Sequence, residues 1–251
     1  MESARKPLTE INNDLYDALG ERWYTAEDDP VALLRAESRL RNPWVAETLS
    51  KKFLGRKCKA LDVGCGGGFL SNALAKKGHE VTGIDASEES LKIARRYDET
   101  ASVDYRMGDA YALPFADASF DAVCAMDFLE HVDDPAKVVA EAGRVLKKDG
   151  LFFFHTFNRN FLSWLVVIKG VEWFVKNTPK NLHVYPLFVK PEELKVYCEK
   201  GGLVFEELHG SRPKLSRAFW RMLRTGIVPS DFEFVFSLST RVAYTGMAKK
   251  R

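Results

Sequence analysis

The chain has 251 residues, of which 46% are hydrophobic and 29% are charged, and such fractions are typical of a soluble globular protein. This composition excludes a disordered tail protein, a collagen and a disulfide scaffold. The formal net charge of +2 argues neither for nor against an anionic partner.

Cysteine usage and the apolar segments indicate the compartment. The four cysteines form no CxxC pair, which predicts reduced thiols in a cytoplasmic protein. The N-terminus, MESARKPLTE, has no apolar region behind it, and no apolar run reaches the ~18 residues of a spanning helix. We therefore expect a cytoplasmic protein that is not integral to a membrane.

Strand-like and helix-like segments alternate from residue 59 to residue 156. Short apolar runs predict strands over residues 59–63, 80–85, 103–107, 120–126 and 151–156. Helical spacing and end signals predict helices over residues 69–77, 88–97 and 135–147, with Ser87 as the N-cap of the second. Apolar strands separated by helices are typical of a doubly wound α/β sheet of mostly parallel strands.

The alternation of predicted strands and helices ends after residue 156. Residues 158–189 are aromatic-rich and irregular, and a helix then begins with Pro191 at its first position and ends at Gly201. Residues 203–208 and 235–248 predict two more strands, which complete a seven-stranded sheet and pair antiparallel because no crossover helix joins them. Residues 8–20 and 30–49 have helical patterns. We expect one domain over residues 1–251, with a helical cap (1–57), a core (58–156) and a lid insertion with the last strands (157–251).

A glycine loop follows the first strand of the core and opens a helix. Its sequence, Asp62-Val-Gly64-Cys-Gly66-Gly-Gly, lets a ligand approach the backbone closely, and the helix N-terminus favours negative charge. Asp85 ends the second strand 21 positions after Gly64, a spacing that suits a carboxylate on ribose hydroxyls. Phe69 stands where a dinucleotide motif has its third spaced glycine, so a nucleotide oxidoreductase is the less favoured alternative.

Two further carboxylates restrict the class of ligand that the loop could bind. Asp62 would repel a pyrophosphate but attract a cationic amino group, and Asp109, in Gly-Asp-Ala110, could accept a hydrogen bond from an adenine amino group. Together these motifs resemble the class I S-adenosylmethionine-dependent methyltransferases over residues 58–156. The resemblance implies a cofactor site made of the following residues: Asp62, Gly64, Gly66, Asp85, Ala86, Asp109, Ala110 and Met126, the last beside the sulfonium.

A narrower resemblance covers residues 20–200. Its motifs, in chain order, are Met126–Val132, Asn158–Asn160, Ser163–Leu165, Pro179-Lys180 with His183, and Lys190–Leu194. These are similar to the O-methyltransferases of ubiquinone biosynthesis, the 3-demethylubiquinone 3-O-methyltransferase family. The chain departs from that family at Asp127, which replaces a glutamate, and over residues 210–239. The family places an arginine, here Arg41, on the cofactor carboxylate, and its members methylate a phenolic hydroxyl of a polyprenylated quinone precursor.

Two other functions are compatible with the same cofactor-binding core. One is methylation of another small molecule or of RNA, and the other is a non-catalytic protein that only binds the cofactor. A small net charge disfavours RNA, and no DNA partner is expected.

The reaction requires the phenol to lose a proton. With a pKa of ~10, about one phenol in a thousand is ionised at neutral pH, a deficit of roughly 4 kcal/mol. Asp127, Glu130 and His131 have i, i+3, i+4 spacing, and the resemblance implies that they bind Mg²⁺ or another divalent cation. The alternatives are His131 as a direct base, with Glu130 beside it, or a purely structural turn. His155 is a second candidate for the base.

Two segments suggest contact with the inner face of the membrane. Residues 161–175 are rich in bulky apolar side chains, and residues 211–226 interleave five basic residues with aromatic and aliphatic ones. Both suit a substrate with a lipid tail. The alternatives are a lid helix packed on the core, for the first segment, and a solvated or RNA-binding basic face, for the second.

Overall fold

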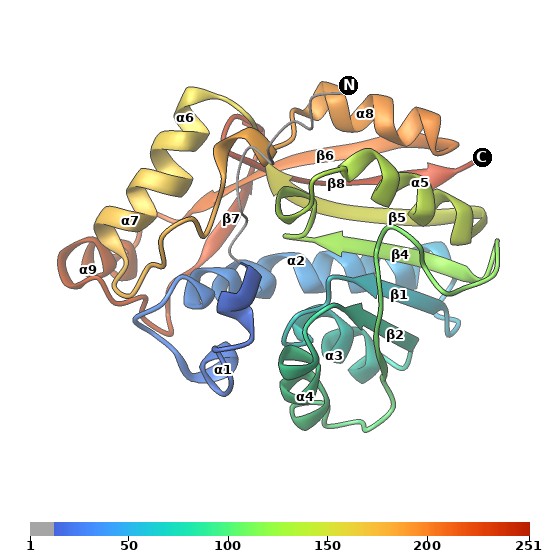
Figure 1. Cartoon of the computed structure of the whole chain (residues 1–251), viewed down its shortest axis with the longest axis horizontal. Coiled ribbons are helices and arrows are strands. Elements are labelled where there is room, and N and C mark those ends of the chain that lie inside the picture. Colours follow the sequence, from blue (N-terminus) through green and yellow to red (C-terminus); the bar gives the residue numbers. More distant parts are fainter. Residues whose placement is uncertain (1–12) are drawn as a thin grey trace, which may run out of the picture.

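The computed structural model describes residues 13–251 and confirms the doubly wound α/β core (Figure 1). Its sheet has the strand order β3-β2-β1-β4-β5-β8-β6-β7. The strands are β1 (Lys59–Val63), β2 (Glu80–Asp85), β3 (Asp104–Met107), β4 (Phe120–Met126), β5 (Leu146–Phe157), β6 (Leu203–Pro213), β7 (Phe234–Ser237) and β8 (Ala243–Lys250). Strands β1 to β5 pair in parallel, and β8, β6 and β7 pair antiparallel. The chain order reverses beside β1, which places a ligand crevice at the carboxyl ends of β1 and β4.

The predicted helices of the core form where expected. The helices of the described region are α1 (Arg22–Thr25), α2 (Val31–Lys52), α3 (Phe69–Lys76), α4 (Glu88–Arg96), α5 (Pro135–Val145), α8 (Pro191–Lys200) and α9 (Arg217–Thr225), besides those of the lid. Ser87 caps α4, since its side chain accepts a hydrogen bond from the Ser90 N–H group. Of the helix predicted over residues 8–20, the described part contains the short 3₁₀ turn Asn13–Tyr16, and residues 8–12 lie outside the described region.

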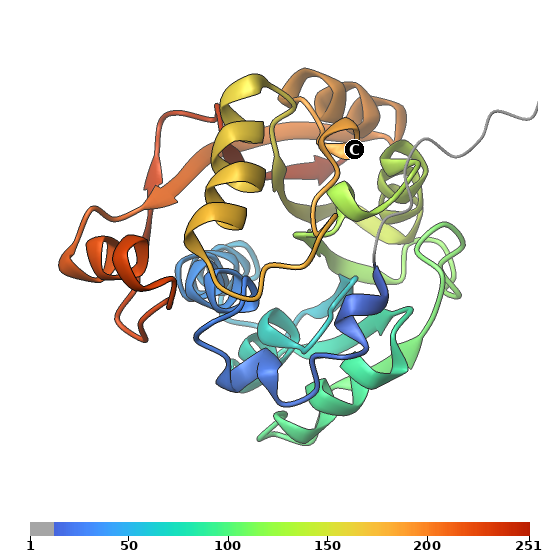
Figure 2. The ribbon, with the colours of Figure 1, turned by 60° about the vertical axis from the view of Figure 1, so that its left-hand side comes forward.

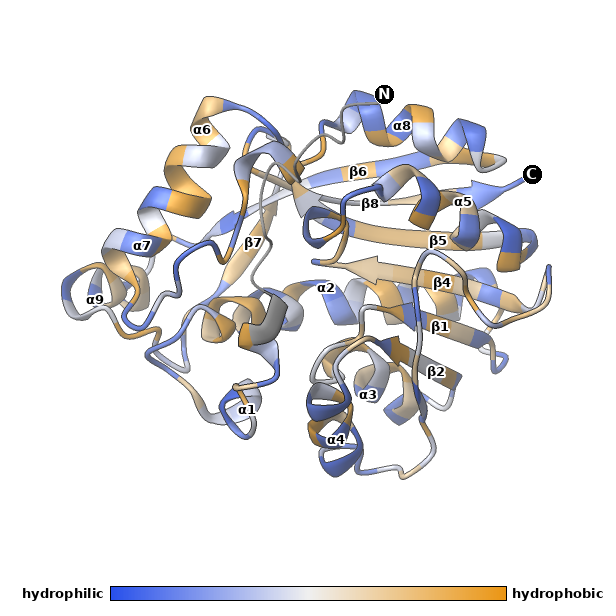
Figure 3. Ribbon diagram, viewed as in Figure 1, coloured by the Kyte–Doolittle hydropathy of each residue, from blue (hydrophilic) through white to orange (hydrophobic). Residues whose placement is uncertain are grey.

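Two hydrophobic cores cover the two faces of the sheet, because successive side chains of a strand point to opposite faces. Phe152 and Phe154 pack with residues of α5 and α8, whereas Leu151 and Phe153 pack with residues of α2 and α3. Figure 3 shows the apolar central strands between these helices. The same alternation places His155 on the face that α2 covers.

The sheet has eight strands instead of seven, because the segment predicted as one strand over residues 235–248 folds into two. Strand β7 pairs with the far end of β6, and β8 lies between β5 and β6. The connection bends away after Ser237, and Leu238 is fully exposed. Gly210 allows the crossing, since a Cβ atom there would lie 1.8 Å from the Ser239 carbonyl oxygen.

The inserted lid is one helical stretch, made of α6 (Phe161–Ser163), the π-helical segment η3 (Trp164–Gly170) and α7 (Val171–Phe174). It stands beside α9 (Figure 2). Val171 and Val175 share a small apolar core with Ala218 and Met222 of α9. Within residues 13–251, no helix combines the length and apolar character needed to span a bilayer. The four cysteines are buried and unpaired, as predicted.

Candidate active site

The glycine loop between β1 and α3 needs glycine for two reasons. Gly64 and Gly66 have φ angles of +69° and +49°, which side chains disfavour. A Cβ atom on Gly64 would also lie 2.1 Å from the Phe128 ring, and one on Gly66 would lie 2.7 Å from the Trp23 ring. Trp23 therefore packs directly on the loop, a contact between distant parts of the chain that the sequence did not predict.

Asp85 lies against this loop at the end of β2. Its Oδ2 atom accepts a hydrogen bond from the Gly66 N–H group at 2.8 Å, and its Oδ1 atom accepts one from the Ser87 N–H group at 2.9 Å. Burial raises the pKa of this carboxyl group. The backbone thus fixes the carboxylate at the carboxyl edge of the sheet, where sequence analysis expects the ribose.

Asp62 is a buried carboxyl group on β1. Its Oδ2 atom accepts a hydrogen bond from the Ser71 hydroxyl at 2.6 Å. Burial raises the pKa of Asp62 to about 7. An ammonium group nearby would stabilise the ionised form, so the site suits a cationic ligand atom.

One cavity of about 830 Å³ joins these residues, a volume within the range of small-molecule and cofactor sites. It reaches from the glycine loop to the apolar side chains of the lid and α9. Of the predicted site residues, those that line it are Arg41, Asp62, Gly64, Gly66, Asp85, Ala86, Met126, Asp127, Glu130 and His131. Asp109 and Ala110 do not line it, and the exposed Asp109 accepts a hydrogen bond from the Tyr111 N–H group.

Arg41 and Asp127 form a buried ion pair that the sequence did not predict. Arg41 is 1% exposed on α2 and donates hydrogen bonds to both carboxylate oxygens of Asp127, with 2.8 Å between Nη1 and Oδ1. Burial is the largest single influence on Asp127 and opposes its ionisation, but the charge and hydrogen bonds of Arg41 together with the nearby His155 and His131 outweigh burial and lower the pKa of the carboxyl group. Asp127 adopts a φ angle of +54°, so it turns sharply as it leaves β4.

Glu130 and His131 lie in the 3₁₀ turn η2 (Leu129–His131) beside this pair. The Oε2 atom of Glu130 accepts a hydrogen bond from the Thr156 hydroxyl at 2.8 Å, and burial raises the pKa of Glu130 to about 8. Burial lowers the pKa of His131 to about 4, which leaves the imidazole neutral at pH 7. Its ring lies within 3.4 Å of the Tyr16 hydroxyl and packs against His183.

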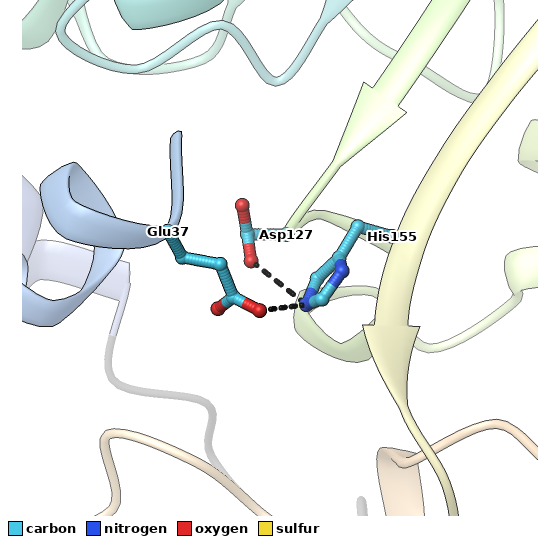
Figure 4. Close-up of side chains that lie close together, drawn as sticks. All are labelled: Glu37, Asp127 and His155. Atoms are coloured by element: carbon cyan, nitrogen blue, oxygen red, sulfur yellow. Dashed lines mark ion pairs between the residues drawn. The ribbon is translucent and has the colours of Figure 1, made fainter. Parts of the chain in front are cut away.

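The structure does not bring Asp127, Glu130 and His131 together as a set of ligands. Within residues 13–251, the three side chains whose donor atoms lie within 4.8 Å of one another are Glu37, Asp127 and His155 (Figure 4). In the structure, the carboxylate of Asp127 pairs with Arg41 and lies 3.4 Å from Nε2 of His155. Because the donor atoms of the predicted set are not assembled, we derive no metal-dependent step from it.

Glu37 is the site residue that sequence analysis missed. A signal was present, because Glu37 and Arg41 are four residues apart and therefore share one face of the predicted helix. An acidic and a basic residue at this spacing are also common on solvated helix surfaces. Here the face is buried, and Glu37 is 6% exposed.

Comparisons with known proteins agree with this fold. Residues 61–154 match the family model of a methyltransferase domain. The solved structure of magnesium protoporphyrin IX methyltransferase from Synechocystis PCC 6803, with bound SAH, has the same fold, with a TM-score of 0.59, 15% identity and coverage of 86% of this chain and 84% of that one. The fold and the matched domain define an S-adenosylmethionine-dependent methyltransferase.

Relatives at higher identity define the family. The ubiquinone biosynthesis O-methyltransferase of Thiobacillus denitrificans is 42% identical and covers 78% of this chain and 83% of its own. The enzyme of the same name from Bordetella avium is 40% identical, and the match covers 80% of this chain and 84% of the relative. The chain belongs to the family of ubiquinone biosynthesis O-methyltransferases, as the sequence motifs indicated.

Proposed function

We propose that this enzyme transfers the methyl group of S-adenosylmethionine to a phenolic hydroxyl of a polyprenylated quinone precursor in ubiquinone biosynthesis. The observation that carries the proposal is one continuous cavity that runs from the glycine loop to the apolar lid. Such a cavity has room for a polar cofactor at one end and an apolar tail at the other. The names of the relatives supply the acceptor class.

Each cofactor group has a candidate partner in this proposal. Asp85 and Ala86 hold the ribose. Asp109 and Ala110 do not line the cavity but directly follow Gly108, whose N–H group donates a hydrogen bond to the Asp85 carbonyl oxygen, and we assign them the adenine. Asp62, Gly64 and Gly66 bind the methionine end together with Arg41, while Met126 lines the wall beside the sulfonium. Methyl transfer is an in-line displacement, and alignment of the acceptor oxygen with the methyl carbon contributes up to ~7–11 kcal/mol.

The acceptor hydroxyl must also lose its proton. We propose that Glu130 and His131 supply the proton acceptor, because both line the cavity beside Met126. The low pKa of His131 keeps its imidazole neutral at pH 7, so the ring is able to accept a proton. The raised pKa of Glu130, about 8, makes its ionised form the stronger base of the two and lies close to the working pH.

Turnover tests this function directly. We expect labelled S-adenosylmethionine to methylate a short-tailed catechol precursor, and we expect the dimethoxy analogue, which has no free hydroxyl, to stay unlabelled. Repeating the assay with EDTA and with added Mg²⁺ measures the metal dependence. Failure of the catechol to accept label, while the cofactor still binds, would contradict the proposed acceptor.

We further propose that the lid and α9 rest on the surface of the membrane that contains the lipid-tailed substrate. Phe161 and Trp173 of the lid and Trp220 of α9 are 70%, 64% and 61% exposed. Lid and α9 also line the cavity, so the apolar tail could pass between the bilayer and the site. Arginines of α9 would contact anionic headgroups.

Removal of these aromatic side chains should weaken membrane binding. We expect the wild-type protein to sediment with phosphatidylglycerol vesicles, and the variant F161S/W173S/W220S to remain in the supernatant, because the buried apolar area is lost. Leu54, which is 84% exposed outside both segments, gives the control variant L54S. Equal sedimentation of the triple variant and the wild type would disprove this contact.

A further inference from the structure

We propose that Glu37 determines which acceptor the enzyme takes, because its carboxylate accepts a hydrogen bond from a second hydroxyl on the acceptor ring. This second hydroxyl is separate from the one that receives the methyl group. The preferred acceptor is therefore an aromatic ring with two hydroxyls, and a ring with one hydroxyl is a poor acceptor. The inference rests on the proposed methyl transfer to a phenol and adds the residue that recognises the ring.

Glu37 lies on the side of the cavity away from the cofactor groups. The glycine loop follows β1 and Asp85 ends β2, so the expected cofactor site lies over the β1 and β2 side of the sheet. The carboxylate of Glu37 instead contacts Ser211 of β6 and lies near His155 of β5. These strands lie beyond β4 in the sheet order, so Glu37 belongs to the part of the cavity that is left for the acceptor.

Glu37 is also close to the place where the methyl group is transferred. One of its carboxylate oxygens lies within 4.8 Å of a carboxylate oxygen of Asp127. Asp127 directly follows Met126, the residue that we place beside the sulfonium. An aromatic ring that presents one hydroxyl to the methyl group can therefore bring a second hydroxyl to Glu37.

One oxygen of the Glu37 carboxylate is held by the protein and the other is available. Oε1 accepts a hydrogen bond from the Ser211 hydroxyl and lies 3.7 Å from Nε2 of His155. Oε2 points away from His155 (Figure 4), and no group within residues 13–251 donates a hydrogen bond to it. Glu37 lines the cavity, so a ligand can reach this oxygen. Because an ionised carboxylate only accepts hydrogen bonds, the ligand group that it binds is a donor such as a hydroxyl.

The apolar surroundings of Glu37 make this recognition selective. Leu33, one helical turn earlier on α2, packs in one apolar core with Phe232 and Phe234, and all three line the cavity. A ring bound against these side chains displaces water from the carboxylate. If the ring has no second hydroxyl, the carboxylate is then left without a donor, which is costly. A site built to bind a substrate hydroxyl rejects the analogue that lacks it for this reason.

Three short-tailed acceptors test the inference. They have a hydroxyl, a methoxy group or a hydrogen atom at the ring position beside the hydroxyl that is methylated. We expect the wild-type enzyme to have the highest kcat/KM with the dihydroxy ring. E37A should lower kcat/KM for that ring by roughly 10–100-fold, the value of one hydrogen bond to a charged group, and should hardly change it for the other two. E37Q should lie between them, because its amide oxygen still accepts a hydrogen bond but has no charge.

Ser38 provides the matched control, since it is the next residue on α2 and also lines the cavity. Its hydroxyl donates a hydrogen bond to the Leu34 carbonyl oxygen at 2.9 Å and is therefore already used within the helix. S38A should keep the wild-type preference among the three rings. Calorimetry with S-adenosylhomocysteine should give wild-type affinity for E37A, which would show that this variant is folded and that its cofactor side is intact.

The outcomes separate this inference from the proposed function. If the wild type methylates the dihydroxy ring and folded E37A has the same preference among the three rings, Glu37 does not select the acceptor, and the proposed function stands. If the wild type methylates none of the rings, the proposed acceptor is wrong. Calorimetry of the dihydroxy ring with the enzyme–S-adenosylhomocysteine complex then decides on Glu37. Weaker binding to E37A than to the wild type would support its role, and equal binding or no binding to either would overturn it.

Discussion

Asp85→Ala is expected to weaken binding of S-adenosylmethionine by roughly two to four orders of magnitude. A carboxylate that accepts hydrogen bonds from two ribose hydroxyls makes two charge-assisted bonds, each worth about 1.5–3 kcal/mol. The hydrogen bonds from Gly66 and Ser87 already hold the carboxylate in place, so little ordering accompanies binding. Isothermal titration calorimetry measures the loss.

The control for this prediction is Glu80→Ala, at the other end of the same strand. Glu80 is exposed and does not line the cavity, so cofactor affinity should be unchanged. Asp85→Asn should fall between Asp85→Ala and the wild type, because it keeps one acceptor oxygen and loses the charge. If Asp85→Ala is folded and binds the cofactor with wild-type affinity, the ribose is held elsewhere.

The glycine loop and Asp85 could be predicted from the sequence because their signals are local. A strand, a turn that requires glycine and a helix N-terminus follow one another within a few residues, and a second strand of matching length ends at Asp85. Parallel pairing of β1 with β2 then brings the two strand ends to the same edge. The cofactor end of the site can therefore be predicted from short-range sequence patterns.

The polar group around Arg41 could not be predicted in the same way. Its members come from α2, β4 and β5, and their contacts depend on how α2 packs on the sheet. Sequence spacing grouped Asp127 with Glu130 and His131, whereas in the structure its carboxylate pairs with Arg41 and lies near His155. Packing between distant parts of the chain thus decided which side chains lie together.

The last third of the chain shows a similar limit. The prediction of one strand over residues 235–248 passed over the polar stretch Ser239-Thr240-Arg241, which lies in the break between β7 and β8. Strand β6 is long enough to pair with β8 along most of its length and with β7 at its end. The partner that each half takes depends on this tertiary pairing, which local propensity does not specify.

Arg41→Met is expected to lower the free energy of unfolding by roughly 3–5 kcal/mol, because it leaves the carboxylate of Asp127 buried without its partner. For a protein of this size, about 1 kcal/mol corresponds to ~2–4 °C, so the melting temperature should fall by roughly 6–20 °C. Differential scanning calorimetry in the presence of EDTA, without cofactor, measures this loss with bound ions excluded. Methionine keeps most of the volume of the arginine side chain, so a cavity makes little contribution.

An exposed ion pair on the same helix is the control that separates the effect of burial on stability from the effect of losing an ion pair. Lys51 pairs with Glu47 at 2.8 Å, and both side chains are exposed, so Lys51→Met should leave the melting temperature almost unchanged. Combining Arg41→Met with Asp127→Asn removes the unpaired charge, and the double variant should be more stable than Arg41→Met alone. If it is less stable, the cost of Arg41→Met does not come from the unpaired carboxylate, and Arg41 stabilises the fold mainly through its attraction to Glu37 and its packing in the cavity wall.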